Sequence, residues 1–233
     1  MTEIFTSNFY EAVKDYSFLL GKKYTPKSIL KLVSDHYSLN TLQRTVLYRG
    51  IVAGFKARVI KSTLVESIRE ANIYIDTYNV LFIIANYLFG RIVFISNDGF
   101  LRDAGQATGK IQSEEVFYKA IDLLFEYLEV QSLQSVMFYV DSPIPYSGLL
   151  AAQLNQEIID HALTGSAVTT HSPDYALKNQ TDGILCTSDS VIIDKGQCRT
   201  FDLALHVLNE KYHPDFIDFG NLPLDDPDHK VDF

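Results

Sequence analysis

The stretch IYIDTYNVLF, residues 73–82, carries one carboxylate and one amide inside an otherwise apolar run. Asp76 ends the first apolar segment, and Asn79 comes three positions later, where the chain turns apolar again. Asp is common in turns after strands, and Asn is a preferred residue at the start of a helix. The same two side chains also fit the rim of an active site. Both interpretations stay open from this stretch alone.

Three more aspartates follow apolar stretches that are typical of strands. Asp98 comes just after RIVFIS, Asp141 follows VMFYV, and Asp189 follows ILCTS. In open parallel sheets, ligands bind beyond the carboxyl ends of the strands. Carboxylates gathered there repel one another, and a divalent cation is the usual group that neutralises them. Oxygen ligands without a His or Cys cluster predict Mg²⁺ or Mn²⁺ rather than zinc.

From residue 71 onwards, apolar strands alternate with amphipathic helices. This alternation predicts an α/β fold, a Rossmann-like and mostly parallel sheet covered by helices on both faces. The expected strands are 72–75, 91–95, 135–140, 167–171 and 183–188. The expected helices are 80–89, 113–130, 149–163 and 201–212.

The first 70 residues carry only helical patterns. Phe9, Val13, Tyr16 and Leu20 recur at helical spacing. Further helices are expected from Pro26, from Thr41 and over residues 63–71. We therefore expect a small all-helical N-terminal domain over residues 1–70, an α/β domain over 71–212 and a loose acidic tail over 213–233.

The second and third of these helices are joined by a short turn, as in a helix-turn-helix. Gln43, Arg44 and Arg49 would lie on the outer face of the pair. Such pairs are common in any small bundle, so a bundle packed on the larger domain is the favoured interpretation, and reading of DNA is the alternative.

The net charge of −9 is unevenly placed along the chain. Residues 1–70 hold 11 Lys/Arg and 6 Asp/Glu, a balance of +5, and the remaining residues carry −14. A basic head on an acidic body fits phosphate contacts made by the head. The two cysteines, Cys186 and Cys198, form no disulfide framework and are expected as reduced thiols in a cytoplasmic protein.

Residues 80–95 form the most apolar stretch, but they contain Asn86, Gly90 and Arg91. An Arg in the middle of a span costs about 2.5–3.5 kcal/mol on insertion scales. We therefore expect a buried helix followed by a buried strand, and no membrane association.

Two of these stretches resemble the motifs of a known superfamily. YIDTYNVL is similar to the opening of NYN-type PIN-like domains, and PDYALKNQTDGILCTSDS is similar to their closing pattern. PIN-like domains are metal-dependent nucleases with a Rossmann-like fold, and the resemblance covers residues 71–212. The whole chain resembles an uncharacterised prokaryotic family in which a small helical domain precedes a PIN-like domain. The stretches that carry this second resemblance are YTPKSILKLVSDHYSLNTLQRTVLYRG, IDTYNVL, NDGFLRD, DSPIPYSG, SPDYAL and TSDSVIID.

The resemblance implies an aspartate site. Asp76, Asp141, Asp174 and Asp189 match the superfamily's acids and Asn79 matches its amide. The implied metal ligands are Asp76, Asp141 and Asp189, and Asn79 would fix Asp76 or contact the substrate. From the basic head, Arg44 and Arg49 are also expected to contact substrate.

The chain departs from the superfamily's pattern in two places. Val191 stands where PIN-like domains often have a further Asp, and an acid from the long helix is not assigned, although Glu114 or Glu115 could serve. Asp98 and Asp103 are expected to shape a turn at Gly99 and to pair with Arg102.

The leading hypothesis is a Mg²⁺- or Mn²⁺-dependent PIN-like nuclease, with RNA favoured over DNA as the expected substrate. The alternative is a PIN-like binding or assembly module without catalysis, which the two departures favour. A phosphatase of the haloacid dehalogenase type ranks last, since its second Asp would fall at Tyr78.

Overall fold

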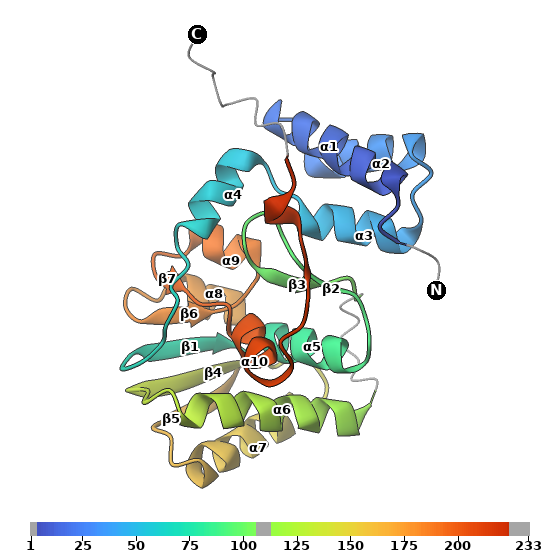
Figure 1. Cartoon of the computed structure of the whole chain (residues 1–233). Coiled ribbons are helices and arrows are strands. Elements are labelled where there is room, and N and C mark those ends of the chain that lie inside the picture. Colours follow the sequence, from blue (N-terminus) through green and yellow to red (C-terminus); the bar gives the residue numbers. More distant parts are fainter. Residues whose placement is uncertain (1–3, 106–112, 224–233) are drawn as a thin grey trace. The chain divides into compact units, whose positions relative to one another are not determined.

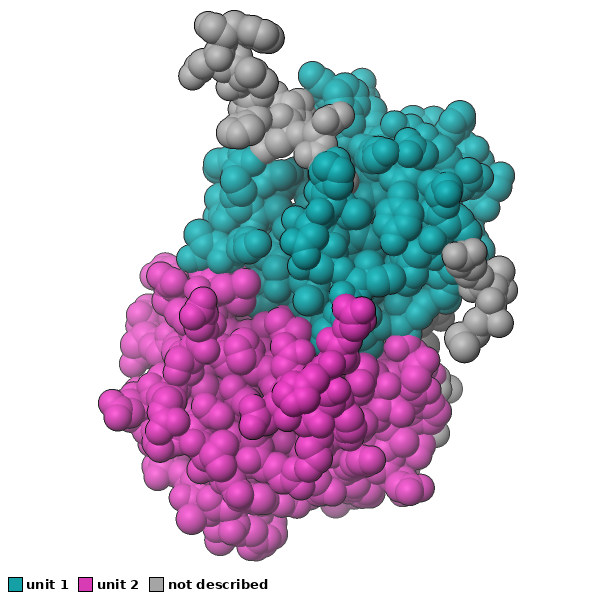
Figure 2. Space-filling model, viewed as in Figure 1, with its two compact units in different colours: residues 1–62, 92–104, 216–233 teal, residues 63–91, 105–215 magenta. Residues whose placement is uncertain are grey.

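The computed structural model describes residues 4–105 and 113–223, which form two compact units (Figures 1 and 2). The first, called here the head unit, comprises residues 1–62, 92–104 and 216–233. The second, called here the sheet unit, comprises residues 63–91 and 105–215. This division differs from the expected boundaries at residues 70 and 212, because the head unit takes one segment from the middle of the chain and one from its end.

The head unit begins with four helices, two of which start at a side-chain cap. They are α1 (Ser7–Gly21), α2 (Pro26–His36), α3 (Thr41–Gly50) and α4 (Gly54–Lys61). Thr6 caps α1 by accepting a hydrogen bond from the Phe9 backbone at 3.2 Å. Asn40 and Gln43 form a reciprocal capping box at the start of α3. The first helix, expected from the spacing of its apolar residues, and the helices expected from Pro26 and Thr41 are therefore confirmed.

The helix expected over residues 63–71 is wrong. The fourth helix is α4, and the chain from Thr63 runs beside strand β7 instead. The Val65 N–H donates to the Thr200 carbonyl at 2.9 Å, and the Thr200 N–H donates to the Thr63 carbonyl at 2.9 Å. These backbone groups form hydrogen bonds with the edge strand β7, so they cannot form the hydrogen bonds of a helix.

A small sheet completes the head unit. Strands β2 (Val93–Ile95) and β3 (Leu101–Asp103) are antiparallel, and β8 (Ile217–Asp218) pairs with β2 in parallel. The stretch 91–95 was expected in the large parallel sheet, and this expectation is wrong. Phe94 of β2 and Phe219 of the short 3-10 helix η1 (Phe219–Asn221) are fully buried in the core of the head helices.

The first part of the acidic C-terminal segment is therefore ordered by its apolar residues, rather than loose as expected. The remainder of that segment, residues 224–233, lies outside the described residues.

The sheet unit contains a five-stranded sheet in the order β5-β4-β1-β6-β7, and every neighbouring pair is parallel. The strands are β1 (Asn72–Asp76), β4 (Ser135–Asp141), β5 (Gly165–Thr170), β6 (Ile184–Cys186) and β7 (Arg199–Thr200). The helices are α5 (Thr77–Leu88), α6 (Glu114–Glu129), α7 (Ser147–Asp160), α8 (Pro173–Lys178), α9 (Ser190–Lys195) and α10 (Leu203–Tyr212). The α/β fold with a helical N-terminal region is confirmed (Figure 1).

Both faces of this sheet are covered by apolar contacts. On one face, Phe125 of α6 stacks on Phe138 of β4 with ring centroids 5.5 Å apart. On the other face, Leu177 of α8 and Ile192 of α9 belong to a buried cluster that packs against Tyr74 of β1. Successive side chains of a strand point to opposite faces. Asp76, two positions after Tyr74 at the carboxyl end of β1, therefore lies on the face that α8 and α9 cover.

Two further expectations from the sequence concern membrane-spanning helices and the state of the two cysteines. None of the helices within residues 4–105 and 113–223 combines the length and the apolarity that a membrane crossing requires. Cys186 and Cys198 are both buried free thiols.

Candidate active site at the carboxyl edge of the sheet

The strand order places three of the predicted acids at one edge of the sheet. Asp76 is the last residue of β1 and Asp141 the last residue of β4, and Asp189 follows β6 by three positions. Strand β1 pairs in parallel with β4 on one side and with β6 on the other. The chain leads outward from β1 to β4 and β5, then returns to β6 and β7, so the topology reverses between β1 and β6. Such a switch point is where open α/β sheets bind their ligands.

The pairing register also places Asp76 and Asp141 on the same face of the sheet. Asp76 is paired with Tyr139, and Asp141 lies two positions beyond Tyr139 on the same strand. Residues two apart along a strand share a face. The face that they share is the one covered by α8 and α9, so helix residues there come near both carboxylates.

Asp76 is at the centre of this arrangement. Its side chain is buried, and Oδ2 accepts a hydrogen bond from the Thr187 hydroxyl at 2.9 Å. The pKa of Asp76 is raised to about 7, first of all by burial; the Thr187 hydrogen bond lowers it, and the negative charges of Asp189, Asp141 and Asp174 contribute to the rise. A carboxylate in these surroundings is costly to ionise unless a cation binds beside it.

The other three acids surround Asp76 and come from separate elements. Burial raises the pKa of Asp141, and the charge of Asp174 adds to this effect. Asp174 lies in the first turn of α8 and pairs weakly with Lys178 across 3.6 Å at an exposed position. Asp189 caps α9, because its Oδ1 accepts from the Val191 N–H at 2.6 Å. We call Asp76, Asp141, Asp174 and Asp189 the acidic edge.

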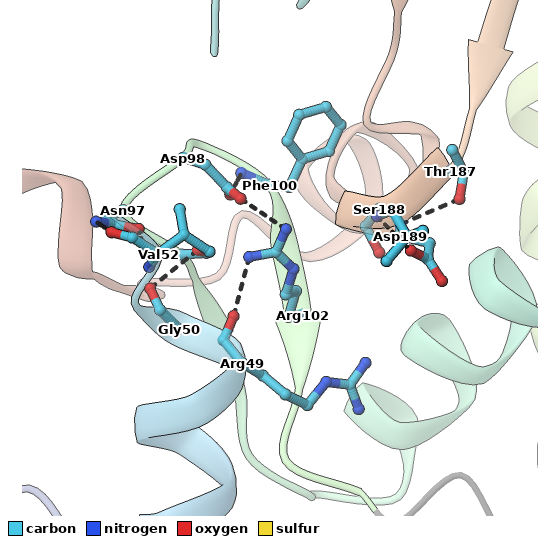
Figure 3. A network of polar contacts seen from close by, with 12 residues as sticks. Arg49, Gly50, Val52, Asn97, Asp98, Phe100, Arg102, Thr187, Ser188 and Asp189 are labelled. Carbon is cyan, nitrogen blue, oxygen red and sulfur yellow. Dashed lines mark hydrogen bonds and ion pairs between the residues drawn. The ribbon is translucent and has the colours of Figure 1, made fainter. Parts of the chain in front are cut away.

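A set of hydroxyl and amide groups holds this edge in shape. The Thr187 hydroxyl oxygen accepts from the Asp189 N–H at 3.1 Å while its hydrogen is donated to Asp76. Thr187 and Ser188 are buried in the β6–α9 turn (Figure 3). Thr187 therefore links the carboxylate of β1 to the turn that carries Asp189. Thr187 and Ser188 were not among the site residues predicted from the sequence, although two hydroxyl residues directly before a strand-end acid are a usable signal.

Asn79 is held from the same turn. Its Oδ1 accepts from the Ser188 N–H at 2.8 Å and from the Ser188 hydroxyl at 3.0 Å. A backbone N–H can only donate, so the side-chain oxygen of Asn79 must face Ser188, and its NH₂ group is turned to another side. Asn79 therefore presents a donor. The neighbouring Thr77 hydroxyl is fully buried and has no hydrogen-bond partner among the described residues.

The donor set fits a hard divalent cation. The carboxylate oxygens of the acidic edge are the ligands that Mg²⁺ and Mn²⁺ prefer, and every charged group that shifts the pKa of Asp76 is an anion. Within the described ranges, no three or more His, Cys, Asp or Glu side chains are close enough to form a ready cage for a metal ion. Mg²⁺ is usually held by one or two carboxylates together with waters and substrate phosphates, so the edge fits this mode of binding.

The remaining predicted acids lie elsewhere. Asp98 follows β2 in the head unit, so it is not at an end of the parallel sheet. It forms a buried ion pair with Arg102 at 2.7 Å, as the sequence predicted (Figure 3). Glu114 and Glu115 are exposed in the first turn of α6, where a helix N-terminus favours acids.

The two arginines expected to contact substrate already have partners in the head unit. Arg44 donates to Asp35 at 3.0 Å and to the Leu39 carbonyl at 2.9 Å. Arg49 pairs with Asp103 at 3.0 Å. Both side chains contribute to the fold of the head, and substrate contact by either of them stays a prediction.

Comparison with known proteins gives two family matches. The family described as Domain of unknown function (DUF5616) matches residues 65–206, and the one described as Protein of unknown function (DUF434) matches residues 8–62. A protein of Methanocaldococcus jannaschii named Uncharacterized protein MJ0935 is 29% identical over 185 residues, which cover 78% of this chain and 88% of that protein. No solved structure matches the chain.

Proposed function

The chain belongs to the family described as Domain of unknown function (DUF5616), and from the acidic edge of its sheet unit we propose that it is a Mg²⁺- or Mn²⁺-dependent PIN-like nuclease that cleaves RNA. One observation carries this proposal. Four carboxylates, from β1, β4, α8 and the N-cap of α9, lie at the carboxyl edge of the sheet, and burial together with the charges of the other three raises the pKa of Asp76 to about 7. A dication is the simplest group that would satisfy them.

Asp76, Asp141 and Asp189 would hold the metal. When bound there, the metal supplies charge for the scissile phosphate and lowers the pKa of an attacking water. The Thr187 hydrogen bond fixes one oxygen of Asp76, so the other oxygen keeps a defined direction. Asp174 is exposed, and its ion pair with Lys178 is weak. Its carboxylate is therefore suited to orient the water or accept its proton.

Asn79 would act on the substrate side. Its oxygen is held by Ser188, so its NH₂ group is available to donate to a phosphate or sugar oxygen. The surplus of basic residues in the first 70 positions would add phosphate contacts that an acidic edge cannot supply.

A binding or assembly module without catalysis is the second candidate. Two observations favour it: the described residues contain no group of three metal-ligating side chains, and Val191 lies exposed on α9 where the PIN-like pattern often has an acid. The two candidates share the acidic edge and differ in whether RNA is cut.

The test is cleavage of a fluorescently labelled RNA by the full chain in Mn²⁺, in Mg²⁺ and in EDTA. We expect metal-dependent cleavage by the wild type and its loss in Asp76→Asn, with retained folding. Asp160→Asn, an exposed carboxylate at the end of α7, is the matched control and should cleave as the wild type does. A wild type that binds RNA but leaves it intact in both metals would support the binding module and overturn the nuclease.

A further inference from the structure

Two tyrosines beside the acidic edge are almost fully exposed. Tyr146 is 79% exposed and Tyr175 is 73% exposed, the highest values among the exposed large hydrophobic side chains of the described residues. Tyr146 lies between β4 and α7, and Tyr175 directly follows Asp174 in α8. An aromatic ring in this position adds little to the core and presents a large apolar face to solvent.

The two tyrosines project from turns that begin side by side. Strands β4 and β5 are paired up to Asp141 and Thr170, and the Ser142 N–H donates to the Thr170 carbonyl at 2.8 Å. The chain after β4 leads to Tyr146 within five residues, and the chain after β5 leads to Tyr175 within five residues. Each of these segments carries one carboxylate of the acidic edge, because Asp141 ends β4 and Asp174 lies in the first turn of α8. The two tyrosines therefore stand on neighbouring segments that also carry two of the four carboxylates of the acidic edge.

The backbone at Tyr146 is in a conformation that bulky residues rarely adopt. Its φ is 66° and its ψ is 11°, in the left-handed region where Gly and Asn are favoured. Tyr146 stands at the N-cap of α7 but its side chain makes no capping hydrogen bond. Hydrogen bonds hold the turn around it, from the Ile144 N–H to the Asp141 carbonyl at 3.2 Å and from the Ser147 hydroxyl to the Ser142 carbonyl at 3.2 Å.

Local stability therefore does not account for a tyrosine at this position. A strained backbone held in place by its neighbours is a reason to look for a function of the side chain.

The charge around the tyrosines restricts what they can bind. The acidic edge repels phosphate groups, so a nucleic acid bound there needs attraction that does not depend on its charge. Stacking of bases on aromatic rings supplies such attraction for any base, and it requires bases whose faces are uncovered. In a duplex both faces of each base are covered by the neighbouring pairs.

We propose that Tyr146 and Tyr175 are stacking platforms that each take one unpaired base of an RNA strand whose backbone crosses the acidic edge. This inference rests on the proposed function for the identity of the ligand. It makes the two tyrosines determinants of specificity for single-stranded over paired RNA.

Binding is measured by fluorescence anisotropy with a labelled 12-nucleotide single-stranded RNA in Mg²⁺, all in an Asp76→Asn background that prevents cleavage. Tyr146→Ala and Tyr175→Ala should each weaken binding by about 5- to 150-fold, in the range found for single bases stacked on aromatic residues. Tyr146→Phe and Tyr175→Phe keep the ring and should bind within about twofold of the parent.

Ile159→Ala is the matched control, because Ile159 is 70% exposed at the other end of the helix that Tyr146 precedes. It should leave binding unchanged. The same RNA annealed to its complement should bind less tightly and should not respond to Tyr146→Ala or Tyr175→Ala.

Unchanged single-strand binding in both alanine variants would overturn the inference even if the wild type cleaves RNA. Loss of binding in the phenylalanine variants would also overturn it, since stacking requires only the ring. A protein that never cleaves RNA but binds single strands through these two rings would refute the nuclease and leave the stacking platforms standing.

Discussion

The pKa of Asp76 leads to a prediction about folding stability in the absence of metal. The pKa is about 7 in the folded chain, against an ordinary value of 3.8. Between these values the unfolded chain has released the proton that the folded chain still holds, so the free energy of unfolding falls as pH rises. This decrease in the free energy of unfolding has not begun below pH 3.8 and is complete above pH 7. The full difference corresponds to about 4 kcal/mol, of which about 3 kcal/mol falls between pH 4.5 and pH 8.

Asp76→Asn removes this titration while keeping the shape of the side chain and an oxygen that can accept from Thr187. We therefore expect the free energy of unfolding of the variant to rise relative to that of the wild type, by about 3 kcal/mol between pH 4.5 and pH 8. The assay is urea unfolding in EDTA at several pH values, followed by circular dichroism. Asp160→Asn, an exposed carboxylate, should track the wild type at every pH.

A metal ion should reverse this trend. Bound Mn²⁺ favours the ionised form of Asp76, so at pH 8 it should raise the melting temperature of the wild type and not that of Asp76→Asn. If the difference in unfolding free energy between Asp76→Asn and the wild type is the same at pH 4.5 and pH 8, Asp76 titrates normally, and the reasoning from its burial is refuted.

Three further predictions concern the head unit. Arg102→Met should destabilise the chain by about 3–5 kcal/mol in urea unfolding, because it leaves the buried carboxylate of Asp98 without its cation; a loss below about 1 kcal/mol would contradict this. Phe219→Ala should cost about 3–5 kcal/mol in the same assay, since the ring is fully buried among the head helices; a wild-type midpoint would show that the C-terminal segment is dispensable. Charge reversal at Arg44 and Arg49 should weaken RNA binding for all sequences alike and reduce its dependence on salt; unchanged affinity in a salt titration would restrict both residues to their ion pairs.

Much of the fold follows from local patterns in the sequence. The first helix is marked by apolar residues at helical spacing, and the second by a proline at its first position. The strands that end at Asp76 and Asp141 are continuous apolar runs, as expected for strands covered on both faces. Parallel pairing then brings their carboxyl ends to one edge, which made the convergence of the acids predictable.

What could not be predicted depends on contacts between distant residues. The run around Phe94 has the same composition as the strands of the large sheet, and only its pairing with β3 and β8 shows that it belongs to another core. The stretch from Thr63 has helix-forming residues, but its backbone bonds to Thr200, 137 positions away. The role of Thr187 depends on a hydrogen bond to a carboxylate 111 positions earlier. Such partners are invisible to any window of local sequence.

The composition of the head unit from three separate stretches has a consequence for synthesis on the ribosome. Its helices α1 to α3 are made first, but the core that they form also includes Phe94 and Phe219, which are added much later. All residues of the sheet unit have been made before Phe219 is added, so that unit can finish folding first, while the earliest helices wait with part of their apolar surface uncovered. The order in which the two units are completed is thus the reverse of the order in which they begin, and nascent chains stalled short of residue 219 are the species that we expect to engage chaperones.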